Sequence, residues 1–201
     1  NMRLHNFHAI IMPVETCNLA CSYCYVLEKP KTRLSINLAL HIIDELLLHN
    51  DPSKVTRLIW HGGEPMLAGL SFYRSVCIYM HHKYPDHQIE HLIQTNGTLL
   101  KDEWIEFFQA ERFKVGVSLD GSQAIHDSCR KTIDGKGSFK IVYENVQKAR
   151  AKGLITGFIC VLTRNSIPYI QELYDFFHNH KFDFYFHSIT CLTSEIENQL
   201  A

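Results

Sequence analysis

The feature that most constrains the fold of this chain is a repeated alternation between short apolar runs and longer amphipathic stretches. Six runs rich in β-branched and aromatic residues predict strands, at residues 7–14, 55–60, 89–95, 113–119, 154–162 and 182–189. Helical spacing of apolar residues predicts helices between them, at 35–50, 71–83, 102–110, 139–152 and 168–179. Regular alternation favours parallel strands joined by right-handed crossovers.

We therefore predict an α/β fold with parallel strands, in the form of an open, partial (β/α)6 barrel of the TIM-like type. Six units are too few for the complete barrel of eight. A doubly wound flat sheet is the alternative, because it shows the same alternation along the chain. Residues 1–201 are expected to form one domain, since a chain of this length with 46% apolar residues can bury a sizeable core.

Charge and hydropathy exclude several classes of partner. The formal net charge is −1 and the sequence has no run of basic residues, so neither nucleic acid nor an anionic membrane surface is expected as a partner. No apolar run approaches the ~20 residues that a bilayer span needs, and the N-terminus lacks the apolar core of a signal peptide. We expect a cytoplasmic protein.

Three of the seven cysteines lie within eight residues, at the spacing C-x3-C-x2-C: Cys17, Cys21 and Cys24. A loop this short can direct three thiolates at one centre. They could hold three irons of a 4Fe–4S cluster and leave the fourth iron open, or hold zinc with a histidine or water as the fourth ligand. The cluster is favoured, because the paired C-x2-C knuckles typical of structural zinc are lacking.

The other four cysteines give weaker signals. Cys77 lies on a helical face and Cys160 within a predicted strand, so both are expected in the core. Cys129 and Cys191 lie nearer the ends of strands, and the sequence assigns neither a role. An odd number of cysteines in a chain of this size favours ligand thiols in a reducing compartment over a disulfide framework.

The chemically unusual segments fall directly after predicted strands. In parallel β/α architectures the carboxyl ends of the strands form the ligand-binding edge, so this placement predicts an enzyme site. A glycine pair in one of these segments permits close approach of the backbone to a ligand. Arg130 lies in a long polar connection and is by default a solvated surface arginine, although it could pair with a carboxylate. The segments are 17–24, 62–65, 95–97, 118–121, 163–165 and 188–191.

The combination of C-x3-C-x-Y-C at residues 17–24 with G-G-E-P at 62–65 resembles the radical S-adenosylmethionine (SAM) enzymes. The resemblance extends over nearly the whole chain, since further motifs match the SPASM-type branch that modifies peptides and proteins. That branch includes the anaerobic sulfatase maturases and the ribosomal-peptide maturases. The further motifs are Q-T-N-G at 94–97, S-L-D-G at 118–121, and the segments 126–130, 137–139 and 161–163.

The resemblance implies roles residue by residue. Cys17, Cys21 and Cys24 would bind a 4Fe–4S cluster whose open iron chelates the amino and carboxylate groups of SAM. Arg130 would pair with the SAM carboxylate, and Tyr23 would lie near the adenine. The remaining SAM contacts would be the backbone of Gly62, Gly63, Glu64 and Pro65 at the amino group, Asn96 near the ribose, and Ser118 at the methionyl and ribosyl part.

The implied activity is reductive cleavage of SAM to a 5′-deoxyadenosyl radical, which abstracts a hydrogen atom from a peptide or protein substrate. Such an oxidoreductase-type maturase would take its electron from a donor such as flavodoxin or ferredoxin. Members of the branch continue into a cysteine-rich C-terminal domain with auxiliary clusters, which residues 1–201 do not include. Two alternatives are a non-catalytic metal-binding or redox module and a core fragment that binds SAM without substrate turnover.

Overall fold

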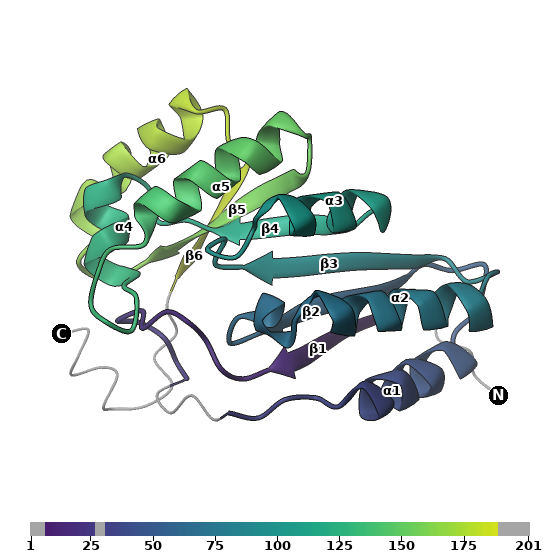
Figure 1. Ribbon diagram of the computed structural model, residues 1–201. Coiled ribbons are helices and arrows are strands. Elements are labelled where there is room, and N and C mark those ends of the chain that lie inside the picture. The colour runs from purple at the N-terminus through teal and green to yellow at the C-terminus, as the bar shows by residue number, and fades with distance from the viewer. Residues whose placement is uncertain (1–6, 27–30, 189–201) are drawn as a thin grey trace. The chain divides into compact units, whose positions relative to one another are not determined.

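Six strands form a sheet whose order follows the chain, β1-β2-β3-β4-β5-β6, in a computed structural model that describes residues 7–26 and 31–188 (Figure 1). A doubly wound sheet reverses its strand order part-way, so the consecutive order agrees with the (β/α)6 prediction and not with the alternative. The α/β class with parallel strands is confirmed. The strands are β1 (His8–Val14), β2 (Thr56–Gly62), β3 (Ile89–Thr95), β4 (Lys114–Ser118), β5 (Ile155–Leu162) and β6 (Phe184–Ser188).

The five predicted helices are present, and the structure adds one more. The five are α1 (Ile36–Leu48), α2 (Leu70–Lys83), α3 (Asp102–Ala110), α5 (Phe139–Ala151) and α6 (Ile170–Asn179). The addition, α4 (Gln123–Cys129), lies in the polar connection after β4, where seven residues are too few to show a helical period. Short 3-10 turns follow β2 at Pro65–Ala68 (η1) and β5 at Ile167–Tyr169 (η2). No helix in these described ranges is long and apolar enough to cross a membrane.

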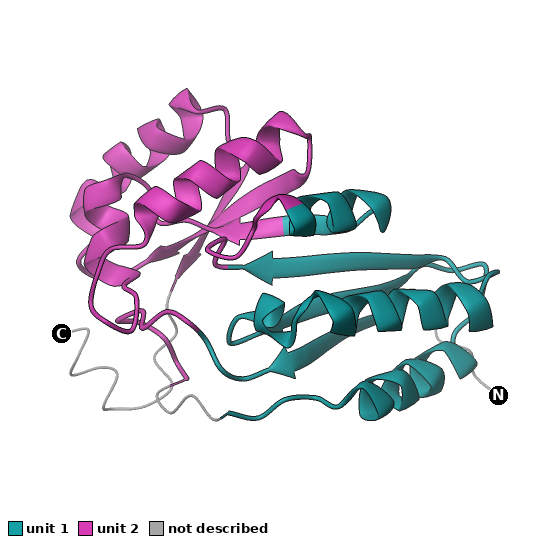
Figure 2. Cartoon of the chain, viewed as in Figure 1, with its two compact units in different colours: residues 1–17, 29–95, 103–115 teal, residues 18–28, 96–102, 116–201 magenta. Residues whose placement is uncertain are grey.

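The chain divides into two compact units, coloured separately in Figure 2. Unit 1 takes in the described residues of 1–17, 29–95 and 103–115. Unit 2 takes in those of 18–28, 96–102 and 116–201. Cys191, to which the sequence assigns no role, lies outside the described residues.

In unit 1, β1 pairs with β2 and β2 with β3, all parallel. Alternate side chains of these strands are buried, among them Leu58 and Trp60, while Ile10 and Met12 of β1 are exposed. Such alternation is that of a sheet covered on one face, and α1 and α2 lie along the same side of these strands (Figure 1). The covered face is rich in aromatic rings, and Tyr73 of α2 packs edge-on against Trp60 with ring centroids 5.3 Å apart.

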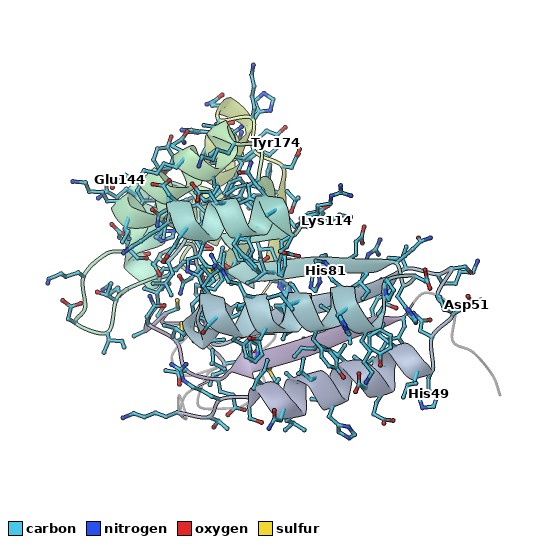
Figure 3. All side chains as sticks on the ribbon, turned by 45° about the vertical axis from the view of Figure 1, so that its right-hand side comes forward. His49, Asp51, His81, Lys114, Glu144 and Tyr174 are labelled. Carbon is cyan, nitrogen blue, oxygen red and sulfur yellow. The ribbon has the colours of Figure 1, made fainter. Side chains whose placement is uncertain are left out.

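Ion pairs mark the solvent-facing parts of unit 1. The Glu90 carboxylate of β3 bridges Arg57 of β2 and Lys114 of β4, with N–O distances of 2.5 Å to each. His81 of α2 lies 3.3 Å from Glu111 after α3. His81 and Lys114 are both labelled in Figure 3. Exposed pairs of this kind contribute little to stability, about 0–1 kcal/mol each.

In unit 2, β5 pairs in parallel with β6. Its core is a second aromatic cluster, in which Phe158 of β5 stacks on Phe182 at 4.4 Å and Phe177 of α6 stacks on Phe184 of β6 at 4.6 Å. Phe158, Phe177 and Phe182 are buried. Each unit therefore has its own apolar core, and the ends of the strands carry the polar segments noted in the sequence.

Candidate functional site

The segment that carries the three clustered cysteines, residues 17–24, is called the cysteine loop here. Its backbone is paired with the end of α4 and the residues directly after it. The N–H of Ala20 donates to the carbonyl of Lys131 at 2.7 Å, and the N–H of Ser22 donates to the carbonyl of Cys129 at 3.0 Å. Leu19 is buried next to this pairing. Backbone hydrogen bonds from alternate residues are the pattern of a paired β-strand, so this part of the loop has a fixed, strand-like backbone.

The three predicted cluster ligands are half-buried and thus reachable by a cofactor. Cys17 is the last residue of the first segment of unit 1, while Cys21 and Cys24 belong to unit 2. Cys21 and Cys24 form a turn, in which the Cys24 N–H donates to the Cys21 carbonyl at 3.1 Å. None of the six described cysteines forms a disulfide. Within residues 7–26 and 31–188 the structure does not gather three or more His, Cys, Asp or Glu side chains into a metal site.

In unit 1 the glycine pair at the end of β2, Gly62 and Gly63, packs directly on the residues that lead to Cys17. The Gly63 N–H donates to the Val14 carbonyl at 3.1 Å, and the Glu64 N–H donates to the Thr16 carbonyl at 2.9 Å. A Cβ on Gly62 would lie 2.6 Å from the Val14 oxygen, and one on Gly63 would lie 2.2 Å from the Thr16 oxygen. Only glycine permits this approach, so the pair supports the start of the cysteine loop.

The Glu64 side chain points into unit 1 and is fully buried, with 0% exposed. Its Oε1 accepts the Met66 N–H at 3.1 Å, which caps η1, and the Thr95 hydroxyl at 2.8 Å. Pro65 is buried too, and its carbonyl accepts the Tyr73 hydroxyl at 3.0 Å. A buried carboxylate needs such donors, so Glu64 and Pro65 fix the turn itself.

In unit 2 Asn96 is tied to the start of the cysteine loop. Its Nδ2 donates to Asn18 Oδ1 at 2.8 Å, and its Oδ1 accepts the Thr98 hydroxyl at 2.7 Å. Asn18 in turn donates to the Thr98 hydroxyl at 2.8 Å. The three side chains form a closed ring of hydrogen bonds that holds Asn18, the residue after Cys17. Ser118, which ends β4, is half-buried.

Arg130 is buried, with 5% of its surface exposed, which corrects the default expectation of a solvated surface arginine. The reason is the Asp120 carboxylate, for which the sequence predicts no role of its own. Arg130 Nε donates to Asp120 Oδ2 at 2.8 Å, and the Tyr23 hydroxyl donates to the same oxygen at 2.5 Å. The guanidinium also lies over the Tyr23 ring, 5.3 Å from its centroid, and Nη1 is 4.0 Å from Cys21 Sγ.

Electrostatics keep the Arg130 guanidinium charged although it is buried. Burial is the largest single influence and lowers the pKa of Arg130, but Asp120, Tyr23 and Cys21 together raise that pKa overall. Burial raises the pKa of Tyr23 well above its ordinary value, so the phenol stays protonated and can donate to Asp120. One buried carboxylate therefore meets one guanidinium and one neutral hydroxyl.

A second set of buried contacts supports the backbone around Arg130. The Asp120 N–H donates to His126 Nδ1 at 3.2 Å, so the other nitrogen, Nε2, carries the proton that it shares with Ser138 Oγ at 3.0 Å. The Ser138 hydroxyl donates to the Arg130 carbonyl at 2.8 Å. Burial lowers the pKa of His126 to about 4, so the imidazole is neutral near pH 7.

A model of the radical SAM superfamily matches residues 11–177 of this sequence. This chain belongs to the radical SAM superfamily. The superfamily uses a 4Fe–4S cluster and SAM, the two cofactors expected from the sequence. The donor set of this radical SAM chain fits them, since three half-buried thiols lie in one loop and none is in a disulfide.

Relatives of this radical SAM chain include maturation enzymes. It is 38% identical over 179 residues to a serine-type anaerobic sulfatase-maturating enzyme of Bacteroides thetaiotaomicron, covering 85% of this chain and 43% of the relative. It is 32% identical over 185 residues to a cysteine-type anaerobic sulfatase-maturating enzyme of Clostridium novyi, covering 87% and 49%. The solved structure of native anSMEcpe with bound AdoMet and Cp18Cys peptide is 28% identical, with a TM-score of 0.85 over 94% of this chain and 52% of that one. The chain spans about half the length of these relatives.

Two further cysteines have the structural role that the sequence predicts for them. Cys77 and Cys160 are buried, and burial raises the pKa of both thiols. Cys129 is buried at the end of α4, and its carbonyl belongs to the pairing with the cysteine loop. Asp120 and His126 are the residues of this site that sequence reasoning missed, although both lie in matched motifs. The signal in the sequence is an acidic residue directly after the strand predicted at 113–119, with the histidine six residues further on.

Proposed function

We propose that residues 1–201 are the radical SAM core of an enzyme that modifies a peptide or protein side chain. The observation that carries this proposal is the match to the superfamily over residues 11–177, joined to relatives that are named as sulfatase-maturating enzymes. When bound, the cluster would supply one electron that splits a C–S bond of SAM into methionine and a 5′-deoxyadenosyl radical, which can take a hydrogen atom from the substrate.

In this proposal Cys17, Cys21 and Cys24 hold the cluster. Three thiolates leave one iron without a protein ligand, and SAM would occupy that position through its amino and carboxylate groups. The anchoring on both sides of the loop supports this assignment. In unit 1 the glycine pair holds the residues before Cys17, and in unit 2 the strand-like pairing holds the residues around Cys21.

The proposed SAM contacts follow from the chemistry of each group. Arg130 would bind the SAM carboxylate. Its Nε is hydrogen-bonded to Asp120, and the fork of its terminal nitrogens has the geometry that suits a carboxylate. The amino group, a donor, would meet carbonyl oxygens of the Gly62–Pro65 segment, because the N–H groups of Gly63 and Glu64 already donate within unit 1. Tyr23 would lie beside the adenine, with Asn96 and Ser118 near the ribosyl part.

The substrate we propose is a peptide with a serine or cysteine side chain, the residues that appear in the names of the relatives. The electron would come from a small redox protein such as flavodoxin or ferredoxin. We place the enzyme in the cytoplasm, where cysteine ligands stay reduced.

The test is anaerobic reconstitution with iron and sulfide, followed by dithionite, SAM and a serine- or cysteine-containing peptide. We expect about four irons per chain, 5′-deoxyadenosine and a peptide that has lost hydrogen. Cys24→Ala should abolish deoxyadenosine formation, whereas Cys77→Ala, a matched change of a buried thiol in α2, should retain it. Full activity of Cys24→Ala would overturn the ligand assignment. Zinc in place of iron would favour a non-catalytic metal module, and deoxyadenosine without peptide change would favour a core that binds SAM without turnover.

A further inference from the structure

Asp120 is the point at which three segments of unit 2 meet. Its Oδ2 binds Tyr23 of the cysteine loop and Arg130 at the end of α4, and its Oδ1 accepts the N–H of Val161 in β5 at 2.9 Å. The side chain is buried, with only 2% exposed. One carboxylate thus receives donors from a loop, a helix end and a strand.

The contact with Arg130 leaves a defined part of the guanidinium for a ligand. The guanidinium plane is restrained by two contacts. Its Nε donates a hydrogen bond to the Asp120 carboxylate, and the face of the guanidinium lies over the Tyr23 ring. One of the terminal nitrogens, Nη1, lies 4.0 Å from Cys21 Sγ. The proposed carboxylate contact and a proposed cluster ligand are therefore neighbours within unit 2.

The position of Asp120 is itself fixed by the scaffold. Its own N–H donates to His126 Nδ1, and the preceding residue, Leu119, donates its N–H to the carbonyl of Ile159 in β5 at 3.0 Å. Gly121 follows at φ +77°, where a Cβ would lie 2.2 Å from Leu173 of α6. The backbone on both sides of Asp120 is therefore held, by the hydrogen bond of Leu119 before it and by the turn at Gly121 after it.

We propose that Asp120 is a positioning residue for SAM binding: it fixes the orientation of Arg130 and the placement of the cysteine loop through Tyr23. The inference rests on the proposed function, because it assigns a role to Asp120 through a residue that would touch SAM. Asp120 itself meets neither the substrate nor the reacting atoms in this proposal. Its effect is to keep two flexible side chains in one arrangement before the ligand arrives.

The first measurement is steady-state formation of 5′-deoxyadenosine by the reconstituted Asp120→Asn variant. Loss of one charge-assisted contact corresponds to about a tenfold to hundredfold weaker affinity. We expect the KM for SAM to rise at least about tenfold and kcat to change less than about threefold, because Arg130 would bind the ground state and the transition state alike. Asp127→Asn is the matched control. It removes the same charge from α4, where Asp127 accepts the Phe139 N–H at 2.8 Å and is not a partner of Arg130.

The second measurement needs no cofactor and is amide hydrogen exchange in the apoprotein. The hydrogen bonds from Ala20 to Lys131 and from Ser22 to Cys129, the last residue of α4, protect the cysteine loop. Asp120→Asn should accelerate exchange in the peptide that contains these amides by about tenfold, and Asp127→Asn should leave it unchanged. A wild-type protein that forms no deoxyadenosine would refute the proposed function, and the exchange data would still decide whether Asp120 places the loop.

A double-mutant cycle separates positioning from a general loss of stability. If Asp120 acts through Arg130, Asp120→Asn combined with Arg130→Gln should raise the KM no further than Arg130→Gln alone. Additive effects, an unchanged KM in Asp120→Asn, or equal changes in Asp127→Asn would each overturn the inference. If Asp120→Asn does not melt cooperatively, Tyr23→Phe replaces it. That variant removes one donor to Asp120 but keeps its ion pair with Arg130, so no buried charge is left unpaired. Unaltered exchange of the loop in Tyr23→Phe would likewise overturn the inference.

Discussion

Replacement of Gly63 by alanine provides a severe test of how the cysteine loop is anchored in unit 1. A Cβ at this position would lie 2.2 Å from the Thr16 oxygen and 2.3 Å from the Glu15 oxygen. Both are backbone atoms that cannot rotate away as a side chain can. The two segments would have to separate, which breaks the bonds from Gly63 to Val14 and from Glu64 to Thr16.

The expected cost combines strain with lost hydrogen bonds. Overpacking costs about 1–3 kcal/mol, and each hydrogen bond contributes about 1 kcal/mol. We therefore expect Gly63→Ala to lower the free energy of unfolding by about 3–5 kcal/mol. With a urea dependence of about 1–3 kcal/mol per molar, the unfolding midpoint should fall by about 1 M or more.

The assay is urea unfolding of the apoprotein, with Gly135→Ala as the matched control. Gly135 has φ +83° and no atom within 4 Å of the place that a Cβ would take, so alanine there meets backbone strain alone, about 1–2 kcal/mol. Because Thr16 precedes Cys17, Gly63→Ala should also lower the iron content after reconstitution, while Gly135→Ala should retain it. Equal losses of stability in the two variants, or no loss in Gly63→Ala, would refute the reasoning.

Two further predictions concern buried polar groups. Burial lowers the pKa of His126 to about 4 from an ordinary value of 6.5. Between these two pH values the unfolded chain therefore binds more protons than the folded chain. The stability that the neutral imidazole contributes is complete above pH 6.5 and is lost as the pH falls toward 4. That contribution is about 3 kcal/mol. In urea unfolding, the free energy of His126→Gln should depend less on pH over this range than that of the wild type, whereas His81→Gln, a change of an exposed histidine, should follow the wild type. Identical pH profiles of His126→Gln and the wild type would contradict this prediction. Thr95→Val removes a donor to the buried Glu64 carboxylate and should lower the free energy of unfolding by about 1–3 kcal/mol in the same assay, a prediction that an unchanged midpoint would disprove.

The fold could be predicted because its signals are local. The strand predicted at 89–95 is observed as Ile89–Thr95, and the one predicted at 113–119 as Lys114–Ser118. Apolar runs with β-branched residues bury one face of a strand, and that pattern repeats every two residues. The helix α4 escaped prediction because its seven residues bury only Ile125, His126 and Cys129, too few to establish a period.

The candidate site could be predicted only as far as residue types at strand ends. The burial of Arg130 depends on Asp120, and the loop contact depends on a bond between Tyr23 and Asp120 that spans 97 residues of sequence. No periodicity records which of several carboxylates a buried guanidinium meets. Such pairing is decided by tertiary structure, and the burial of a charged side chain is its clearest mark.

The pairing of the cysteine loop with the end of α4 also bears on how the chain tolerates change in length. Ala20 and Ser22 donate to Lys131 and Cys129 in strand register, with Leu19 turned into the core. One inserted residue here would reverse the alternation, expose Leu19 and bury a polar neighbour. The spacing of the loop is thus restrained by the cofactor chemistry and also by the register of the backbone pairing. An insertion in the loop should therefore destabilise the fold even when no cofactor is bound.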